Sequence, residues 1–109
     1  MEDLKTQIIG LFLHRLRAIL TNKESWFFVP RQENRDCLFQ LNMSSQDAIA
    51  TIRSLAVADY VKGPEQDENG SEGEVWVFTK PYKRTTLYIK VKLYTDHGAE
   101  KVTIISFHL

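Results

Sequence analysis

Several features that define common protein classes are scarce or absent in this sequence. Its 109 residues include one cysteine, Cys37, so no disulfide can form within the chain and we expect a reducing, cytoplasmic environment. The longest apolar run, residues 8–13, is far shorter than the ~20 residues of a membrane span. The first three residues, Met-Glu-Asp, are acidic rather than basic, which is unlike a secretory signal. These absences predict a cytoplasmic protein that does not bind membranes.

The sequence also lacks net charge and the familiar catalytic motifs. A formal net charge of zero excludes a protein that holds nucleic acid by bulk charge alone, although a local basic patch remains possible. Walker and GxGxxG loops, HExxH, paired CxxC motifs and the local motif of a Ser-His-Asp site are all missing. The three histidines are scattered, and the acidic residues lack the spacing of a calcium loop. We therefore expect no metal ion and no other cofactor.

The composition is that of a folded protein. Apolar residues make up 43% and charged residues 26% of the chain, which is typical of globular domains. A chain of 109 residues suits one hydrophobic core better than two. We therefore expect a single domain over residues 1–109.

The hydrophobic pattern predicts helices first and strands afterwards. In residues 3–21, apolar residues recur at the spacing of a helix. Residues 32–41 show the same pattern less clearly. Residues 44–55 begin with Ser44 and Asp47, the signature of a capping box. A short strand is expected over residues 25–29, and longer strands over 74–80, 85–94 and 101–108. The stripe expected to be buried on the first helix is Leu4, Ile8, Leu11, Phe12, Leu16, Ile19 and Leu20.

Consecutive strands with short connections favour antiparallel pairing. We therefore predict an α+β fold with N-terminal helices packed on one face of a small, mainly antiparallel sheet. Strand 85–94 alternates regularly, so the helices should cover the face of Leu87 and Ile89 and leave Tyr88 and Lys90 open. In the last strand, the same alternation places His108 on the face of Val102, Ile104 and Ser106.

The zero net charge conceals a strong asymmetry. Residues 65–74 carry five acids and no base, whereas residues 75–95 carry five bases and no acid, interleaved with five aromatic residues. Basic residues beside aromatic ones suit a surface that contacts phosphates and stacks bases, and the candidates for RNA contact are Lys90, Lys92, Trp76 and Lys80. The alternative is a solvated sheet face whose lysines protect it from aggregation.

Lysine, tyrosine and histidine are sufficient for RNA cleavage without a metal. Such cleavage needs a base for the 2′-hydroxyl proton, a cation for the phosphoryl charge and an acid for the 5′ oxygen. Each of the three side-chain types can fill one of these roles.

Four stretches in order resemble the MqsR family of bacterial toxin–antitoxin toxins. They are residues 48–62 (AIATIRSL followed by ADYVK), residues 73–78 (GEVWVF), residues 86–92 (TLYIKVK) and residues 103–108 (TIISFH). The order and the gaps agree over residues 44–108. The resemblance implies a RelE-like fold and a small endoribonuclease that cuts mRNA.

The resemblance also implies an active site. The catalytic lysine of the family matches Lys62, and its active-site tyrosine matches Tyr88, with Lys90 beside it. The glutamine of the family is Val77 here, and its terminal lysine is His108. Histidine exchanges protons near neutral pH more readily than lysine, so this substitution is compatible with nuclease chemistry.

The sequence thus favours one function and leaves a second open. The first is a toxin that acts as a metal-independent endoribonuclease on mRNA, with Lys62, Tyr88 and His108 as catalytic residues and a separate antitoxin protein as partner. The alternative is a catalytically inert module that binds RNA or protein on the same scaffold. The sequence does not determine the cleavage motif or the oligomeric state.

Overall fold

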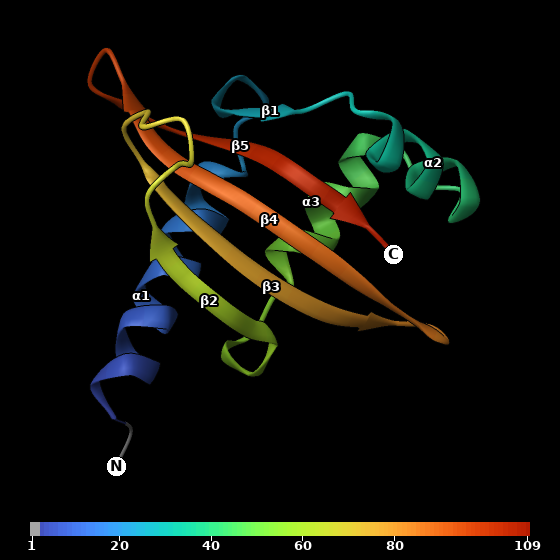
Figure 1. The fold of residues 1–109 in the computed structure, drawn as a ribbon, viewed down its shortest axis with the longest axis horizontal. Helices are drawn as coiled ribbons and strands as arrows, with labels where there is room; N and C mark the ends of the chain where they lie inside the picture. The colour runs from blue at the N-terminus through green and yellow to red at the C-terminus, as the bar shows by residue number, and fades with distance from the viewer. Residues whose placement is uncertain (1–2) are drawn as a thin grey trace.

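The computed structural model describes residues 3–109, which form a five-stranded sheet flanked by helices (Figure 1). In chain order the elements are α1 (Leu4–Ile19), the short 3-10 helix η1 (Lys23–Ser25), β1 (Trp26–Phe28), α2 (Gln32–Gln40), α3 (Ser45–Arg53), η2 (Val57–Asp59), β2 (Tyr60–Glu65), β3 (Glu74–Tyr82), β4 (Thr85–Asp96) and β5 (Ala99–His108). Within the described residues, no helix is both long and apolar enough to cross a membrane.

The sheet has the strand order β1-β5-β4-β3-β2. Strands β2 to β5 pair antiparallel in sequence order, and β1 adds a short parallel pair at the outer edge of β5. The prediction of an α+β fold with a mainly antiparallel sheet is therefore confirmed.

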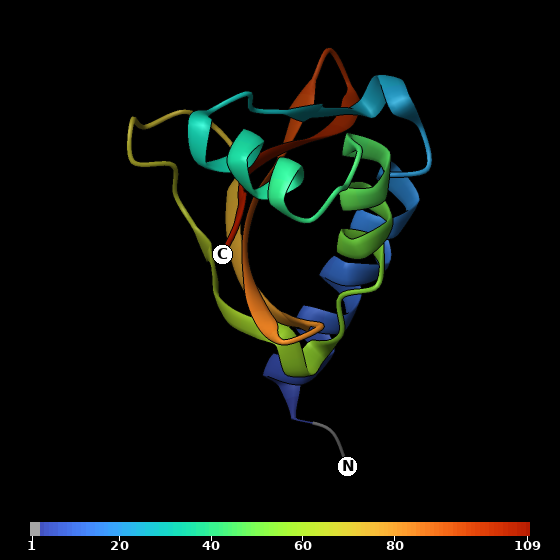
Figure 2. The ribbon, with the colours of Figure 1, turned by 90° about the vertical axis from the view of Figure 1, so that its right-hand side faces the viewer.

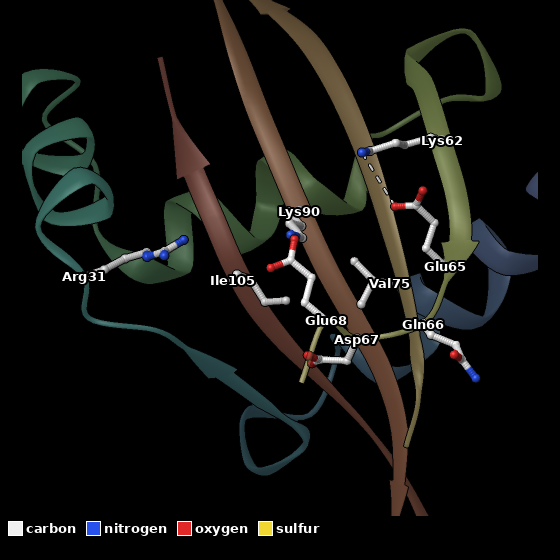
Figure 3. Close-up of a pocket in the computed structure, with 9 residues that line it drawn as sticks. All are labelled: Arg31, Lys62, Glu65, Gln66, Asp67, Glu68, Val75, Lys90 and Ile105. Carbon is white, nitrogen blue, oxygen red and sulfur yellow. Dashed lines mark ion pairs between the residues drawn. The ribbon is translucent and has the colours of Figure 1, made fainter. Parts of the chain in front are cut away.

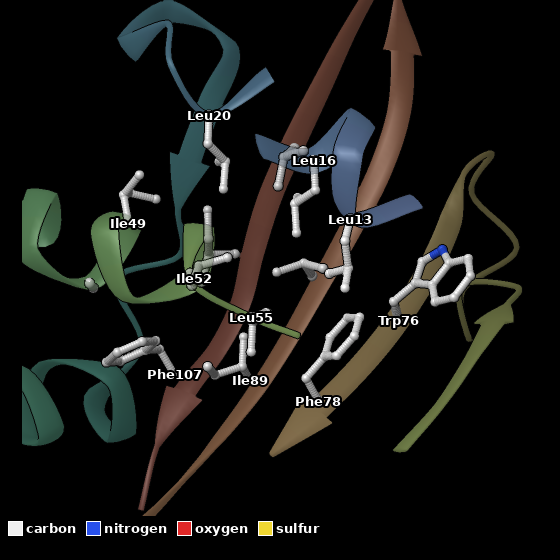
Figure 4. Close-up of a cluster of buried hydrophobic side chains, with 14 of the residues drawn as sticks. Leu13, Leu16, Leu20, Ile49, Ile52, Leu55, Trp76, Phe78, Ile89 and Phe107 are labelled. Atoms are coloured by element: carbon white, nitrogen blue, oxygen red, sulfur yellow. The ribbon is translucent and has the colours of Figure 1, made fainter. Parts of the chain in front are cut away.

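The helices α1 and α3 cover one face of the sheet, as the alternation in β4 predicts (Figure 2). Leu87, Ile89, Val91 and Leu93 of β4 are buried against them. The same core holds Leu13 and Leu16 of α1, Ile49 and Ile52 of α3, and Phe78 of β3 (Figure 4). We call the opposite side of the sheet the open face.

Two local interactions define α3 and fix it to α1. The Ser44 hydroxyl accepts a hydrogen bond from the Asp47 amide (3.0 Å), and the Asp47 carboxylate accepts one from the Ser44 amide (2.9 Å), which confirms the predicted capping box. At the other end, the Arg17 guanidinium donates to the carbonyls of Arg53 (3.0 Å) and Leu55 (2.6 Å). Because carbonyls at a helix C-terminus lack partners within the helix, this arginine stabilises both helices.

The buried stripe of α1 differs from the predicted one. Phe12, Leu16 and Leu20 are buried as expected, but Leu4, Ile8 and Leu11 are 71%, 45% and 66% exposed. Ile8 and Leu11 instead lie at the solvent-exposed margin between α1 and the sheet, where they line a shallow hollow with Pro64 of β2 and Trp76 of β3. Ile9 and Leu13 complete the buried stripe instead.

Strand β2 was not expected from the sequence. Its register against β3 shifts between Tyr60 and Lys62 and again between Lys62 and Glu65, so it shows no period of two. Gly63 has φ +129°, and a Cβ atom there would lie 2.8 Å from the carbonyl oxygen of Val75. Only glycine fits this close approach of two strands.

A β-bulge corrects the predicted faces of β5. Lys90 of β4 pairs with Ser106, but Val91 pairs with Ile104, so Ile105 is an additional residue on β5. Each extra residue reverses the side-chain alternation beyond it. Ser106 and His108 therefore lie on the open face, opposite to Val102 and Ile104 with which they were expected, and Phe107 enters the core.

Asn34 of α2 stabilises this bulge from the edge of the sheet. Its side chain is 1% exposed, and its amide nitrogen donates to the carbonyls of Val29 (2.9 Å) and Ile105 (3.1 Å). Its amide oxygen accepts from the backbone amide of Phe107 (2.9 Å). Strand β1 has ended at Phe28, so the Asn34 side chain supplies β5 with the donor and acceptor that a longer strand would offer.

Replacing Asn34 should therefore weaken the whole fold. We expect Asn34→Ala to lower the free energy of unfolding by about 2–4 kcal/mol, because it leaves buried backbone groups without partners. Urea unfolding measures this quantity. Gln40→Ala, at the exposed end of the same helix, is the matched control and should change little. Equal stability of the two variants would contradict this role.

Candidate active site

A row of side chains crosses the open face from β2 to β5. Lys62 of β2 pairs with Val77 of β3, Val77 with Lys90 of β4, and Lys90 with Ser106 of β5. Paired residues in a sheet point to the same face, so the two lysines stand on either side of Val77. Val77 is 1% exposed, so it forms an apolar floor between the two ammonium groups.

A second row holds the candidate proton-transfer groups. Tyr88 of β4 pairs with His108 of β5, and their rings are stacked with centroids 5.2 Å apart. The His108 Nε2 atom lies 3.7 Å from the Glu33 carboxylate on α2, and its Nδ1 atom lies 3.1 Å from the backbone oxygen of Leu109. The β5 bulge is what places His108 beside Tyr88, since regular alternation would direct it to the helices.

The first row opens onto a pocket of about 330 Å³. Its lining includes Lys62 and Lys90 from the sheet and Arg31 from the residue before α2 (Figure 3). The end of β2 and the segment after it line the other side of the pocket with Glu65, Gln66, Asp67 and Glu68. The pocket thus has basic groups on the sheet side and acidic groups on the loop side.

The segment of residues 66–73, which we call the acidic loop, is tied to the open face by one ion pair. The Asp67 carboxylate lies 2.8 Å from the Lys92 ammonium, and both side chains are largely buried. This hydrogen bond from Lys92, together with one from the Asn69 amide, lowers the pKa of Asp67 below its ordinary value. Lys92 therefore has its ammonium group engaged by the loop.

Lys62 is the most accessible of the lysines on the open face. Its side chain is 56% exposed and lies 3.6 Å from the Glu65 carboxylate, three residues along β2. Such an exposed ion pair contributes little to stability, so an incoming phosphate can replace the carboxylate at small cost.

Two of the expected RNA contacts lie on the other side of the sheet. Trp76 is 2% exposed and stacks on Phe12 of α1 with ring centroids 4.0 Å apart. The Lys80 ammonium lies 3.8 Å from the Asp59 carboxylate and 3.4 Å from the Ser54 carbonyl, at the exit of α3. Both share the helix-facing side of β3 with Phe78, so a buried indole and a distant lysine do not join the site on the open face.

The structure adds Arg31, Glu33 and Ser106 to the site. None of them has a signal in the sequence, because Arg31 and Glu33 belong to a polar stretch and Ser106 was assigned to the opposite face. The Arg31 Nη1 atom donates to the Ser106 hydroxyl at 3.2 Å. No group of three or more His, Cys, Asp or Glu residues suited to a metal ion occurs among residues 3–109.

The tether of the acidic loop should depend on pH. A carboxyl with a lowered pKa stabilises the folded state above the ordinary pKa of about 4, and this contribution disappears as the pH falls through the lowered value. At neutral pH, Asp67→Asn should imitate the protonated state and release the loop. Cleavage by a glutamate-specific protease at Glu68 and Glu72 should then become faster.

Asp3→Asn is the matched control for this experiment, because the Asp3 carboxylate also has a lowered pKa but caps the start of α1, at the other end of the molecule from the acidic loop (Figure 1). It should leave the rate of cleavage in the loop unchanged. Equal protection of the loop in Asp67→Asn and in the unaltered protein would show that the ion pair with Lys92 does not hold it.

Comparison with known proteins agrees with the resemblance seen in the sequence. Residues 11–109 match the model of the MqsR toxin family, described as motility quorum-sensing regulator, toxin of MqsA. Neither the curated proteins nor the solved structures include a significant match. The family match includes every strand of the sheet and every residue of the open-face site. This chain therefore belongs to the MqsR family of toxins from toxin–antitoxin systems.

Proposed function

We propose that this toxin is an endoribonuclease that cuts mRNA without a metal ion. The observation that carries the proposal is the stacked pair of Tyr88 and His108 on the same face of the sheet as Lys62 and Lys90. When a 2′-hydroxyl attacks the neighbouring phosphate, the reaction requires proton-transfer groups and accessible cations close together.

The positions on the strands suit an in-line displacement. In such a reaction the attacking and the leaving oxygen lie on opposite sides of phosphorus. His108 is on β5 and Lys62 is on β2, with β4 and β3 between them. A phosphate held over Lys90 therefore has one proton-transfer group on either side.

We assign the steps accordingly. His108 accepts the proton of the 2′-hydroxyl, which Tyr88 orients, and the 2′ oxygen forms a bond to phosphorus. The ammonium groups of Lys62 and Lys90 stabilise the charge that develops on the phosphoryl oxygens. The bond to the 5′ oxygen breaks as Lys62 delivers a proton to it. The products are a 2′,3′-cyclic phosphate and a free 5′-hydroxyl.

The partner implied by the family is an antitoxin. The family description names its members as toxins of MqsA, and we propose that a cognate antitoxin of that kind restrains this protein. Expression of the toxin alone in bacteria should then arrest growth, and co-expression of the antitoxin should relieve the arrest.

The first test is cleavage of single-stranded RNA in EDTA. We expect cutting to persist and Lys62→Ala to lower its rate by about 100-fold, the usual scale for the loss of one transition-state donor. Lys83→Ala, in the exposed β3–β4 turn, is the matched control and should cut at the normal rate. The melting temperature of both variants should stay close to that of the unaltered protein, because exposed lysines contribute little stability.

Two outcomes would contradict this scheme. Full activity of a folded Lys62→Ala variant would remove Lys62 from the site, and strict dependence on magnesium would contradict the metal-independent mechanism. RNA binding without any cleavage would favour the alternative of an inert binding module on the same scaffold.

The proton-transfer role of His108 has its own test. We expect His108→Gln to lower the cleavage rate by about 100-fold or more, the usual contribution of general acid–base catalysis. His108→Lys should keep more activity, because lysine occupies this position in the family that the sequence resembles. Similar rates for His108→Gln and the unaltered protein would limit His108 to a packing role beside Tyr88.

A further inference from the structure

We propose that Arg31, held by Ser106, binds a phosphate of the RNA next to the one that is cut. This inference rests on the proposed function, since it names a subsite for the same substrate. Arg31 lines the same pocket as Lys62 and Lys90 and comes from a different part of the fold, the residue before α2 (Figure 3).

The first argument is that the Arg31 side chain is fixed without being neutralised. Its Nη1 atom donates to the Ser106 hydroxyl at 3.2 Å, and Ser106 is 3% exposed, so the anchor is rigid. Lys62 lies beside the Glu65 carboxylate of β2 and Lys92 beside the Asp67 carboxylate of the acidic loop, whereas none of the ion pairs within residues 3–109 includes Arg31.

The second argument comes from the chemistry of the guanidinium group. It presents five N–H donors in a planar fork that matches two oxygens of a phosphate. One of these donors is used by Ser106, so the others remain for an anion. An arginine that is held in place by a neutral hydroxyl loses less conformational entropy when it binds a ligand.

The third argument is the position of Arg31 along the row. Lys62, Val77, Lys90 and Ser106 follow one another across four neighbouring strands, which are about 4.8 Å apart. Arg31 reaches this row from the β5 end, and Lys62 stands at the β2 end. An RNA backbone that follows the row therefore crosses the strands. Arg31 precedes α2, which packs against β5, so it approaches from outside the span between Lys62 on β2 and His108 on β5 and meets the next phosphate along the strand.

The test uses 2′-deoxy oligonucleotides, which lack the attacking hydroxyl and therefore report binding alone. We expect Arg31→Ala to weaken binding of an eight-nucleotide strand at least about tenfold, the scale of a charge-assisted hydrogen bond. The slope of log affinity against log salt should fall by about one. A dinucleotide, which has one phosphate, should bind equally well to both proteins.

Three further variants make the comparison specific. Arg35→Ala removes the same charge one turn later on α2, where the side chain is exposed and outside the pocket, and should bind as the unaltered protein does. Arg31→Lys keeps the charge without the planar fork and should recover part of the affinity. Ser106→Ala releases the guanidinium and should weaken binding less than Arg31→Ala.

With cleavable RNA, Arg31→Ala should raise KM for long strands and leave kcat within about twofold, because a flanking contact binds ground state and transition state alike. Equal affinity of Arg31→Ala and Arg35→Ala, or no binding of the oligonucleotide to the unaltered protein, would overturn the subsite. A loss confined to kcat would place Arg31 at the cut phosphate and overturn its flanking position. If oligonucleotide binding depends on Arg31 but the unaltered protein does not cleave RNA, the subsite stands and the proposed ribonuclease activity is contradicted.

Discussion

The side chain of Asn34 is the constraint on which the site depends. It bonds to the carbonyl of Ile105 and to the amide of Phe107, so it pairs with β5 on both sides of Ser106. The same residue fixes the start of α2, from which Arg31 and Glu33 reach the open face. One buried amide thus holds two parts of the chain in the register that the site requires, and all of its hydrogen-bonding groups are used.

The charges of the protein are arranged as two opposed layers. The basic residues of the sheet and the acidic residues of the acidic loop cancel in the net charge. The Asp67–Lys92 pair shows that they are also in contact. In the proposed function, an RNA strand that enters over the sheet exchanges protein carboxylates for phosphates at these lysines. Because each exchange replaces one anion by another, the net affinity depends on how much better the phosphates fit than the loop does.

The sequence was most informative where one local rule decides the structure. The alternation of β4 correctly predicted its buried and open faces, and Ser44 with Asp47 predicted the start of α3. The sequence could not show β2, because Gly63 and two register shifts remove the period of two. It also could not show the β5 bulge, whose stability depends on Asn34, about 70 residues away in the chain. Lys62, Tyr88 and His108, which the resemblance names, all lie on the open face. Trp76 and Lys80 lie on the helix-facing side, because aromatic and basic composition does not reveal which side of a strand a residue occupies.

The place of β5 in the sheet has a consequence for the synthesis of the protein. Although β5 is the last strand along the chain, it lies inside the sheet, between β1 and β4. Translation has reached residue 96 when β4 is complete, yet β1 still has no partner and Tyr88 has no neighbouring ring. Domains fold as their segments leave the ribosome. A strand that pairs with two distant parts of the chain must be synthesised before those parts can take their final positions in the sheet. A nascent chain that stops short of Ser106 and His108 therefore holds the lysines of β2 and β4 but neither the anchor of Arg31 nor the stacked pair, so the open-face site is assembled only after β5 has been made.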